Sequence, residues 1–237
     1  MHAPATAVAV PITEMFAGRA VPFGPKGEPS AIGKTLAPSP WRIVTHGLAG
    51  DEQGDLVHHG GSDKALHHYP REHYDAWRAA VPALAPHLSQ PAAFGENIST
   101  IGLSELSVCI GDVFKAGSVV LQVSQARQPC WKLNVRFAHS AMAQLVQSSG
   151  RTGWYYRVLE PGIIRPGDEL TCLDRPQPEW PLARILDLLY HRPLDLESLR
   201  QLAEVSQLAS GWRRLIENRI ARRSVEDWSK RLGLSER

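Results

Sequence analysis

A single cysteine in the middle of the chain has neighbours that suit a reactive site. Cys130 lies in SQARQPCWKLN, residues 124–134, with Arg127 before it and Lys132 after it. Thiolates act as nucleophiles and metal ligands, and nearby cations favour that form. Pro129 fixes the chain directly before the sulfur, and the loop follows an apolar alternating run that predicts a strand. The pattern indicates a displayed thiol, and the alternative is a buried structural cysteine.

Half of the ten histidines gather in VHHGGSDKALHHYPREHY, residues 57–74. They are His58, His59, His67, His68 and His73. Adjacent side chains on a strand point to opposite faces, so only one histidine of each pair can enter a common site. Their spacing does not match the usual zinc patterns, which disfavours direct metal binding by these residues.

The same stretch has the makings of an anion site. Gly60 and Gly61 expose backbone N–H groups and Lys64 adds a positive charge, a combination that suits a phosphate. The alternative is a glycine turn before a buried helix. Two further loops carry polar groups beside tight bends, namely AFGENIST at 93–100 and HGLAGDEQGD at 46–55. Turn chemistry explains the first most simply, and the second can contribute Asp51 or Glu52 to a pocket.

Composition excludes several classes of protein. The 237 residues are 43% hydrophobic and 21% charged, which is typical of an ordinary globular protein. The net charge of +2 does not indicate nucleic-acid or membrane partners, and no apolar run approaches the roughly 20 residues of a membrane span. Three cysteines without a CxxC motif fit a reducing cytoplasmic setting, and Cys109 and Cys172 lie in strand-like runs that predict a structural role. No secretory signal is recognisable at the N-terminus.

The first three quarters of the chain predict a β-rich fold. Short runs with β-branched and aromatic residues alternate with Gly and Pro, which favours a barrel or sandwich. We expect strands over 5–10, 41–45, 104–110, 112–117, 118–124, 154–160 and 169–174. Helices are predicted over 69–82 and 140–150, embedded in this β region. No GxGxxG motif follows a strand, so a dinucleotide fold has no support.

A proline-rich linker at residues 174–181 precedes a helical tail. We therefore divide the chain into a β-barrel domain, 1–175, and a small three-helix domain, 176–237. Asp195 and Ser210 are predicted caps of the second and third helices. Basic residues mark the outer face of this tail, which is either a solvated surface or an interaction surface. They are Arg213, Arg214, Arg219, Arg222 and Arg223.

Taken in order, six segments resemble MOSC domains, the molybdenum cofactor sulfurase C-terminal family. They are GLAGDEQGD, VHHGGSDKALHHYPREHY, AFGENIST, IGDVF, VSQARQPCWKL and GWYYRVLEPG. The chain is most similar to the bacterial YiiM-like branch, in which a three-helix domain follows the MOSC domain. The resemblance implies a mixed, mainly β fold, a MOSC-type barrel with embedded helices. It also implies a bound molybdenum cofactor and the reduction of N-hydroxylated compounds such as hydroxylaminopurines to amines.

The resemblance assigns roles to particular residues. Cys130 aligns with the cysteine that ligates molybdenum, which suits a soft thiolate. Residues expected to bind the cofactor are Gly60, Gly61, Lys64, Asn97, Arg127 and Lys132. His59 or His68 is expected to hydrogen-bond the cofactor or to pass protons. His67 stands where a bacterial member carries a cysteine, so we assign position 67 no essential role. Pyridoxal phosphate binding stays open.

These inferences also define partners and rivals. Electrons must come from an external donor protein, because no flavin, haem or iron–sulfur motif is present. The small-molecule substrate is N-hydroxylated, no nucleic acid or membrane is expected, and a homodimer is left open. One rival is a sulfur carrier that holds a persulfide on Cys130. The other is a non-enzymatic cofactor-binding module that docks a partner through its basic tail.

Overall fold

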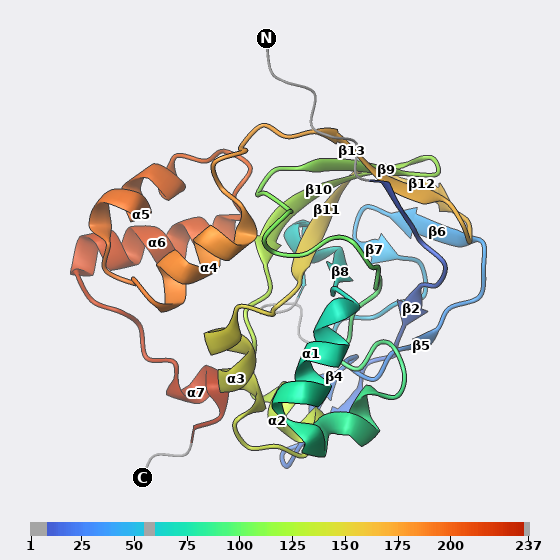
Figure 1. Cartoon of the computed structure of the whole chain (residues 1–237), viewed down its shortest axis with the longest axis horizontal. Coiled ribbons are helices and arrows are strands. Elements are labelled where there is room, and N and C mark those ends of the chain that lie inside the picture. Colours follow the sequence, from blue (N-terminus) through green and yellow to red (C-terminus); the bar gives the residue numbers. More distant parts are fainter. Residues whose placement is uncertain (1–8, 55–59, 235–237) are drawn as a thin grey trace.

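The computed structural model describes residues 9–54 and 60–234. Its centre is a six-stranded antiparallel sheet that curls into a half barrel, with the strand order β1-β13-β9-β10-β11-β8 (Figure 1). The strands are β1 (Ala9–Pro11), β8 (Leu66–His68), β9 (Val113–Ala116), β10 (Val119–Ala126), β11 (Trp154–Glu160) and β13 (Glu169–Asp174). The fold is mixed and mainly β, as the sequence predicts.

Alternation along the central strands explains which face of the sheet is buried. Val119, Leu121 and Val123 of β10 point into the main core, and Trp154 and Tyr156 of β11 join them there. Burying such side chains stabilises the fold by about 1.5–3 kcal/mol each. The residues between them point to the opposite face, and that face carries the polar groups described below.

Smaller sheets lie to one side of the main sheet (Figure 1). β12 (Gly162–Ile164) pairs with β6 (Trp41–Val44), which pairs with β7 (Gly47–Leu48). Two short pairs complete this side, β2 (Phe16–Ala17) with β5 (Thr35–Leu36) and β3 (Val21–Phe23) with β4 (Glu28–Ser30). The predicted strands at 41–45, 112–117, 118–124, 154–160 and 169–174 are confirmed within a few residues. Of the predicted strand at 5–10, only residues 9 and 10 are described.

The strand predicted at 104–110 is wrong. The segment forms a turn in which Ser107 donates its backbone N–H to the carbonyl of Ser104, 3.0 Å away. The backbone N–H of Cys109 donates to the carboxylate of Asp112. Local partners thus satisfy groups that a ladder would otherwise use, and the alternating sequence alone does not reveal them.

The embedded helices form a second core beside the sheet. They are α1 (Glu72–Ala80), the 3-10 helix η2 (Pro82–Leu88), α2 (Lys132–Arg136) and α3 (Met142–Ser149). Tyr74 and Trp77 of α1 pack with Phe94, Leu133 and Phe137. The helices predicted over 69–82 and 140–150 are confirmed, and Gly150 ends α3 in the left-handed conformation.

The tail consists of α4 (Leu182–Tyr190), α5 (Leu196–Ala203), α6 (Ser210–Arg222) and the short α7 (Ser229–Leu232). Apolar residues of α4, α5 and α6 belong to the same core cluster as the main sheet. The division into domains at residue 175 stays a prediction. Asp195 caps α5 as expected, whereas α6 begins at Ser210 itself and its cap position is Ala209. Among the described residues, no helix combines the length and apolar character needed to cross a membrane.

The structure corrects part of the prediction that five arginines form a basic outer face on the tail. Arg219 is only 1% exposed, and its guanidinium pairs with Glu226 and donates to the carbonyl of Leu189. Arg213 turns back to donate to the carbonyls of Ala203 and Val205. The exposed arginines of this set are Arg214, Arg222 and Arg223.

Candidate functional site

A small polar cavity lies where the main sheet, the β4 segment and the Cys130 loop meet. It has a volume of about 90 Å³, and its walls include Lys34, Asp51, His67, Arg127 and Cys130. A wider groove of about 820 Å³ borders the same place. The two spaces share five lining residues, which are Gly54, Lys64, Cys130, Lys132 and Tyr155. Cys130 therefore stands at the junction between an inner cavity and an outer groove.

Strand register places the cavity residues side by side. His67 of β8 pairs with Tyr155 of β11, and Tyr155 pairs with Gln125 of β10. A register shift between Val123 and Gln125 inserts Ser124 as an extra residue in β10. Bulges of this kind redirect the side chains that follow them. Beyond the bulge, the strand leads directly into the loop that carries Arg127 and Cys130.

The two histidines of β8 point in opposite directions, as the alternation of a strand requires. His67 lines the cavity. His68 faces the core, where its Nδ1 lies 3.0 Å from the Tyr156 hydroxyl and its Nε2 lies 2.9 Å from the Thr100 hydroxyl. Burial lowers the pKa of His68 to about 3. Its place in the structure does not support the cofactor or proton role predicted for it.

His67 is the histidine that the cavity contains, although we assigned position 67 no essential role. Its side chain is buried, and its Nε2 has no hydrogen-bond partner among the described residues. Burial and, after it, the charge of Arg127 hold the pKa of His67 well below its ordinary value. The ring is therefore neutral near pH 7 and offers a hydrogen bond without a net charge.

The cysteine is held by a loop with defined ends. The backbone N–H of Arg127 donates to the carbonyl of Gly153, 2.9 Å away, and fixes the start of the loop. The carbonyl of Cys130 accepts from the N–H of Leu133 at 3.0 Å, as α2 begins. Cys130 is only 8% exposed, yet it lines both the cavity and the groove. Its sulfur is thus held in a sheltered place that still borders open space.

Three predicted cofactor-binding cations line the cavity. They are Lys64, Arg127 and Lys132. Arg127 donates to the carbonyl of Phe94 at 2.8 Å, and Lys132 donates to the carbonyl of Pro29 at 2.7 Å. Within the described parts of the chain, no ion pair joins either of these two side chains to a carboxylate. Their charges are oriented by neutral carbonyls, which suits the binding of an anion.

A buried ion pair forms another wall. The ammonium of Lys34 contacts both carboxylate oxygens of Asp51, and both side chains are less than a tenth exposed. Burial lowers the pKa of Lys34, and Asp51 opposes that shift. The expectation that Asp51 or Glu52 reaches a pocket is confirmed, because both line the cavity. Lys34 was not predicted from the sequence.

Asn97 lines the cavity as predicted, but its hydrogen bonds are directed to the protein. Its Oδ1 accepts from the backbone N–H of His67, and its Nδ2 donates to Asp51 and to the carbonyl of Phe16. Asn97 thereby fixes β8 relative to the buried ion pair. Glu96 beside it accepts from backbone N–H groups of its own turn, so turn chemistry accounts for that residue.

Two predicted cofactor contacts lie apart from the cavity walls. Gly61 precedes the 3-10 helix η1 (Ser62–Lys64) with φ +97°, and neither it nor Gly60 lines the cavity or the groove. Only Lys64 of this predicted anion site reaches them. His59 lies outside the described residues.

Tyr155 joins the site without having been predicted. Its ring lies 5.0 Å from the ring of His67, and it lines both the cavity and the groove. Burial raises the pKa of Tyr155, so its hydroxyl keeps its proton at neutral pH. It can therefore donate a hydrogen bond beside Cys130. The signal available in the sequence was its place between two core aromatics, Trp154 and Tyr156, on an alternating strand.

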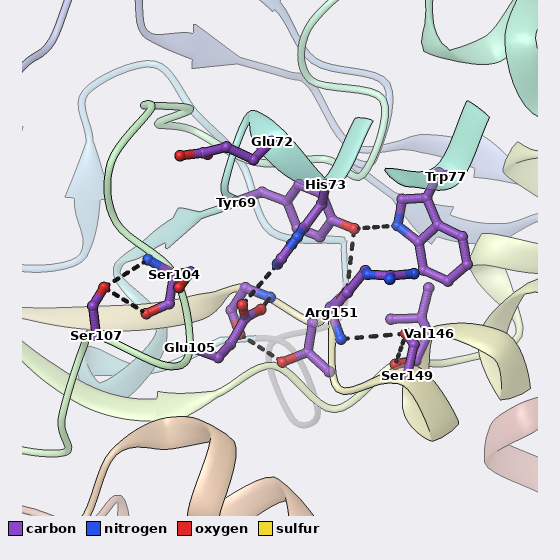
Figure 2. A network of polar contacts seen from close by, with 12 residues as sticks. Tyr69, Glu72, His73, Trp77, Ser104, Glu105, Ser107, Val146, Ser149 and Arg151 are labelled. Carbon is purple, nitrogen blue, oxygen red and sulfur yellow. Dashed lines mark hydrogen bonds and ion pairs between the residues drawn. The ribbon is translucent and has the colours of Figure 1, made fainter. Parts of the chain in front are cut away.

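A polar network holds the backbone at the start of β11 (Figure 2). The carboxylate of Glu105 accepts from the N–H of Gly153 and bonds Nε2 of His73, each at 2.7 Å. Tyr69 donates to the carbonyl of Arg151 at 3.1 Å. A Cβ at Gly153 would lie 2.3 Å from the carbonyl oxygen of His68 and 3.0 Å from Nε2 of His67. The network thus fixes Gly153 at a place where the backbone approaches β8 too closely for any residue with a side chain.

The residues at the junction fit a cofactor with a soft metal and an anionic group. Cys130 offers a sulfur ligand, the ligand type that soft metals prefer. Arg127 and Lys132 present charges beside it that suit a phosphate. The neutral ring of His67 lies within the same walls.

The curled sheet, the cysteine loop and the helical tail define a mixed, mainly β protein with C-terminal helices and a cavity lined by a cysteine. The MOSC domain model matches residues 55–171, and the YiiM-like 3-alpha helix domain model matches residues 180–223. The chain belongs to the MOSC family, in its YiiM-like branch.

Relatives agree with this assignment. Protein YiiM of Escherichia coli (strain K12) is 40% identical over 88% of this chain and 92% of its own length. The crystal structure of YiiM from Escherichia coli superposes with a TM-score of 0.80, with 33% identity over 95% of this chain and 98% of that one. A protein named "Reductase" from Gibberella moniliformis (strain M3125 / FGSC 7600) is 40% identical over 76% of this chain, which spans 31% of that protein.

Proposed function

We propose that this protein is a molybdenum-cofactor-dependent oxidoreductase that reduces N-hydroxylated compounds, such as hydroxylaminopurines, to amines. The observation that carries the proposal is the position of Cys130 at the junction of a cavity and a groove, beside two oriented cations. The MOSC family membership and the relative named "Reductase" support the same class of reaction.

Different residues of the cavity would bind different parts of the cofactor. Cys130 would hold the molybdenum through its thiolate. Arg127, Lys132 and Lys64 would hold the cofactor's phosphate, and the ring of His67 would lie at the edge of the cofactor. When bound, the cofactor supplies two-electron redox chemistry and oxygen-atom transfer. The buried ion pair of Lys34 and Asp51 forms a fixed part of the cavity wall and adds no net charge to it.

The reaction also needs protons at a defined place. Conversion of R–NHOH to R–NH₂ and water breaks the N–O bond and consumes two electrons and two protons. Tyr155 keeps its proton at neutral pH and stands beside the cysteine, so it can donate a hydrogen bond to the departing oxygen. His67 is neutral and can take the same role from the inner side. The electrons come from an external donor protein.

The test is to produce the protein in cells with and without molybdenum cofactor synthesis and to assay hydroxylaminopurine reduction with a chemical electron donor. We expect activity only in protein from cofactor-producing cells. Cys130→Ser should reduce it to the rate seen without protein, whereas the control Cys172→Ser, at a half-buried thiol on β13, should retain it. Unchanged activity in Cys130→Ser contradicts the proposal, and a persulfide on Cys130 without molybdenum supports a sulfur carrier instead.

A further inference from the structure

The C-terminal arm, residues 224–234, leaves the helical bundle and returns to the β-rich part of the protein. Figure 1 shows α7, in red, beside α3 and apart from α4, α5 and α6. Helices α4, α5 and α6 share one apolar core, and Trp228 of the arm packs against it. Further along, at residues 231–233, the arm contacts the loop that carries the cysteine.

Both neighbours of Cys130 are hydrogen-bonded to one residue of the arm. The N–H of Trp131 donates to the carbonyl of Arg231 at 2.7 Å. The Arg231 guanidinium donates to the carbonyl of Pro129 at 2.5 Å and to Oε1 of Gln147 at 2.6 Å. Arg231 therefore joins the cysteine loop to α3, and hydrogen bonds from a charged donor are stronger than neutral ones.

Packing reinforces these bonds. Leu232 is 2% exposed and belongs to the second core with Leu133 of α2. A Cβ at Gly233 would lie 2.7 Å from Cβ of Trp131, so the close approach of the arm to the loop depends on glycine. The amide of Asn134 donates to the carbonyl of Leu232 at 2.8 Å.

The arm is also braced at its other end. Arg219 of α6 donates through Nε and Nη2 to the two carboxylate oxygens of Glu226, at 2.9 and 2.6 Å. Its Nη1 donates to the carbonyl of Leu189 in α4 at 2.8 Å, and the indole of Trp228 donates to Glu226 at 2.8 Å. A continuous set of contacts therefore runs from the interior of the bundle to the cysteine.

The arm forms one side of the groove as well. Asp227, Lys230 and Arg231 line it, and Cys130, Trp131 and Gln128 line it from the loop. Asp227 and Lys230 are exposed, so they face whatever enters the groove. A molecule that occupies this groove therefore lies beside both the arm and the cysteine loop.

We propose that the C-terminal arm is part of the functional site, in which Arg231 positions the Cys130 loop and the arm forms the outer wall of the groove that admits the substrate. This inference rests on the proposed function for the identity of the substrate. The helical domain then serves the reaction directly. Arg231 is a positioning residue, since it acts through the backbone on either side of the cysteine.

Site-resolved alkylation tests the positioning role without any cofactor. The rate at which iodoacetamide modifies Cys130 in the cofactor-free full chain is measured by mass spectrometry for the wild type, Arg231→Ala, Arg231→Lys and the control Arg222→Ala. Arg222 is an exposed arginine of the neighbouring helix α6. We expect Arg231→Ala to react about tenfold faster, because two charged hydrogen bonds that restrain the loop are lost. Arg231→Lys should restore most of the protection, and Arg222→Ala should match the wild type.

Several outcomes would overturn the inference. A Cys130 rate within about twofold of the wild type in a cooperatively folded Arg231→Ala protein would do so. If Arg231→Ala does not fold, Gln147→Leu removes one partner of Arg231 at nearly constant volume and should raise the rate about threefold, and an unchanged rate there overturns the inference equally.

A reductase assay of the cofactor-loaded variants separates this inference from the proposed function. We expect Arg231→Ala to lower kcat, while Lys230→Ala raises KM for the substrate and leaves kcat nearly unchanged. If the alkylation rates change as expected but no variant, nor the wild type, reduces N-hydroxylated compounds, the proposed function fails and the positioning role stands. A loaded Arg231→Ala protein with wild-type kcat contradicts the positioning role.

Discussion

Acid should destabilise this protein through His68, the histidine of β8 that faces the core. Burial lowers its pKa to about 3, whereas an exposed histidine titrates near 6.5. Between these two pH values, the histidine is therefore protonated in the unfolded chain and neutral in the folded protein. Stability that is fully present above pH 6.5 is lost as the pH falls towards 3.

The size of the effect follows from the same two values. At pH 5 the unfolded imidazole is almost fully protonated and the folded one is neutral. The loss relative to pH 7 is then about 2 kcal/mol, since each pH unit in this window costs about 1.4 kcal/mol.

Denaturant unfolding at pH 7 and pH 5 measures this contribution when the wild type is compared with His68→Gln. Glutamine fills part of the same space, offers a hydrogen bond to Thr100 and does not titrate. The substitution should destabilise at pH 7, and its cost should shrink by about 2 kcal/mol at pH 5. Other titrating groups contribute equally to both proteins and cancel. The same cost at both pH values would refute the placement of a neutral His68 in the core.

Two further predictions concern the walls of the cavity. Asp51→Ala should destabilise the protein by about 3–5 kcal/mol in denaturant unfolding, because it leaves the Lys34 ammonium buried without its partner; a loss below about 1 kcal/mol would contradict the buried pair. Gly153→Ala should destabilise more than Gly150→Ala by about 1–3 kcal/mol. Both glycines have positive φ near +70°, but a Cβ at Gly150 meets no atom within 4 Å whereas one at Gly153 meets His68 and His67; equal melting temperatures for the two variants would contradict the close approach.

The sequence predicted the cysteine-bearing side of the site well. Arg127 and Lys132 flank Cys130 within three residues, so any compact loop brings them together, and the structure places all three on the cavity wall. Asp51 was predicted as a pocket residue because it is an acid in a glycine-rich loop. Local spacing is enough where the residues of a site are neighbours in the chain.

The sequence could not predict which of the two histidines of β8 faces the cavity. Two adjacent histidines show that one faces each side, but a shift of one residue in the register exchanges them. The register depends on pairing with Trp154 and Tyr155 of β11, almost ninety residues away. The same pairing brings Tyr155 into the cavity, which explains why that residue was missed as well.

Long-range contacts explain the remaining misses. Lys34 lines the cavity, where it is paired with Asp51 from a loop seventeen residues further along the chain. Arg219 was predicted to be part of a basic surface. Its partner Glu226 lies seven residues further along the chain, beyond the end of α6. Charged residues with buried partners cannot be told from surface residues by composition alone.

The contacts of the arm also change how one rival function must be tested. Deleting residues 180–237 would remove a partner-docking tail, but it would also release the Cys130 loop from Arg231. Loss of function in such a deletion therefore does not distinguish the two explanations. Substituting the exposed Arg214 and Arg222 together leaves the arm in place and tests docking alone.

The central claim is that Cys130 binds molybdenum. X-ray absorption spectroscopy at the molybdenum edge, on protein from cofactor-producing cells, counts the sulfur ligands directly. The dithiolene of the cofactor provides two, so we predict three sulfur ligands in the wild type and in Cys172→Ser, and two in Cys130→Ser. Two sulfur ligands in both the wild type and Cys130→Ser would show that the cysteine does not bind the metal.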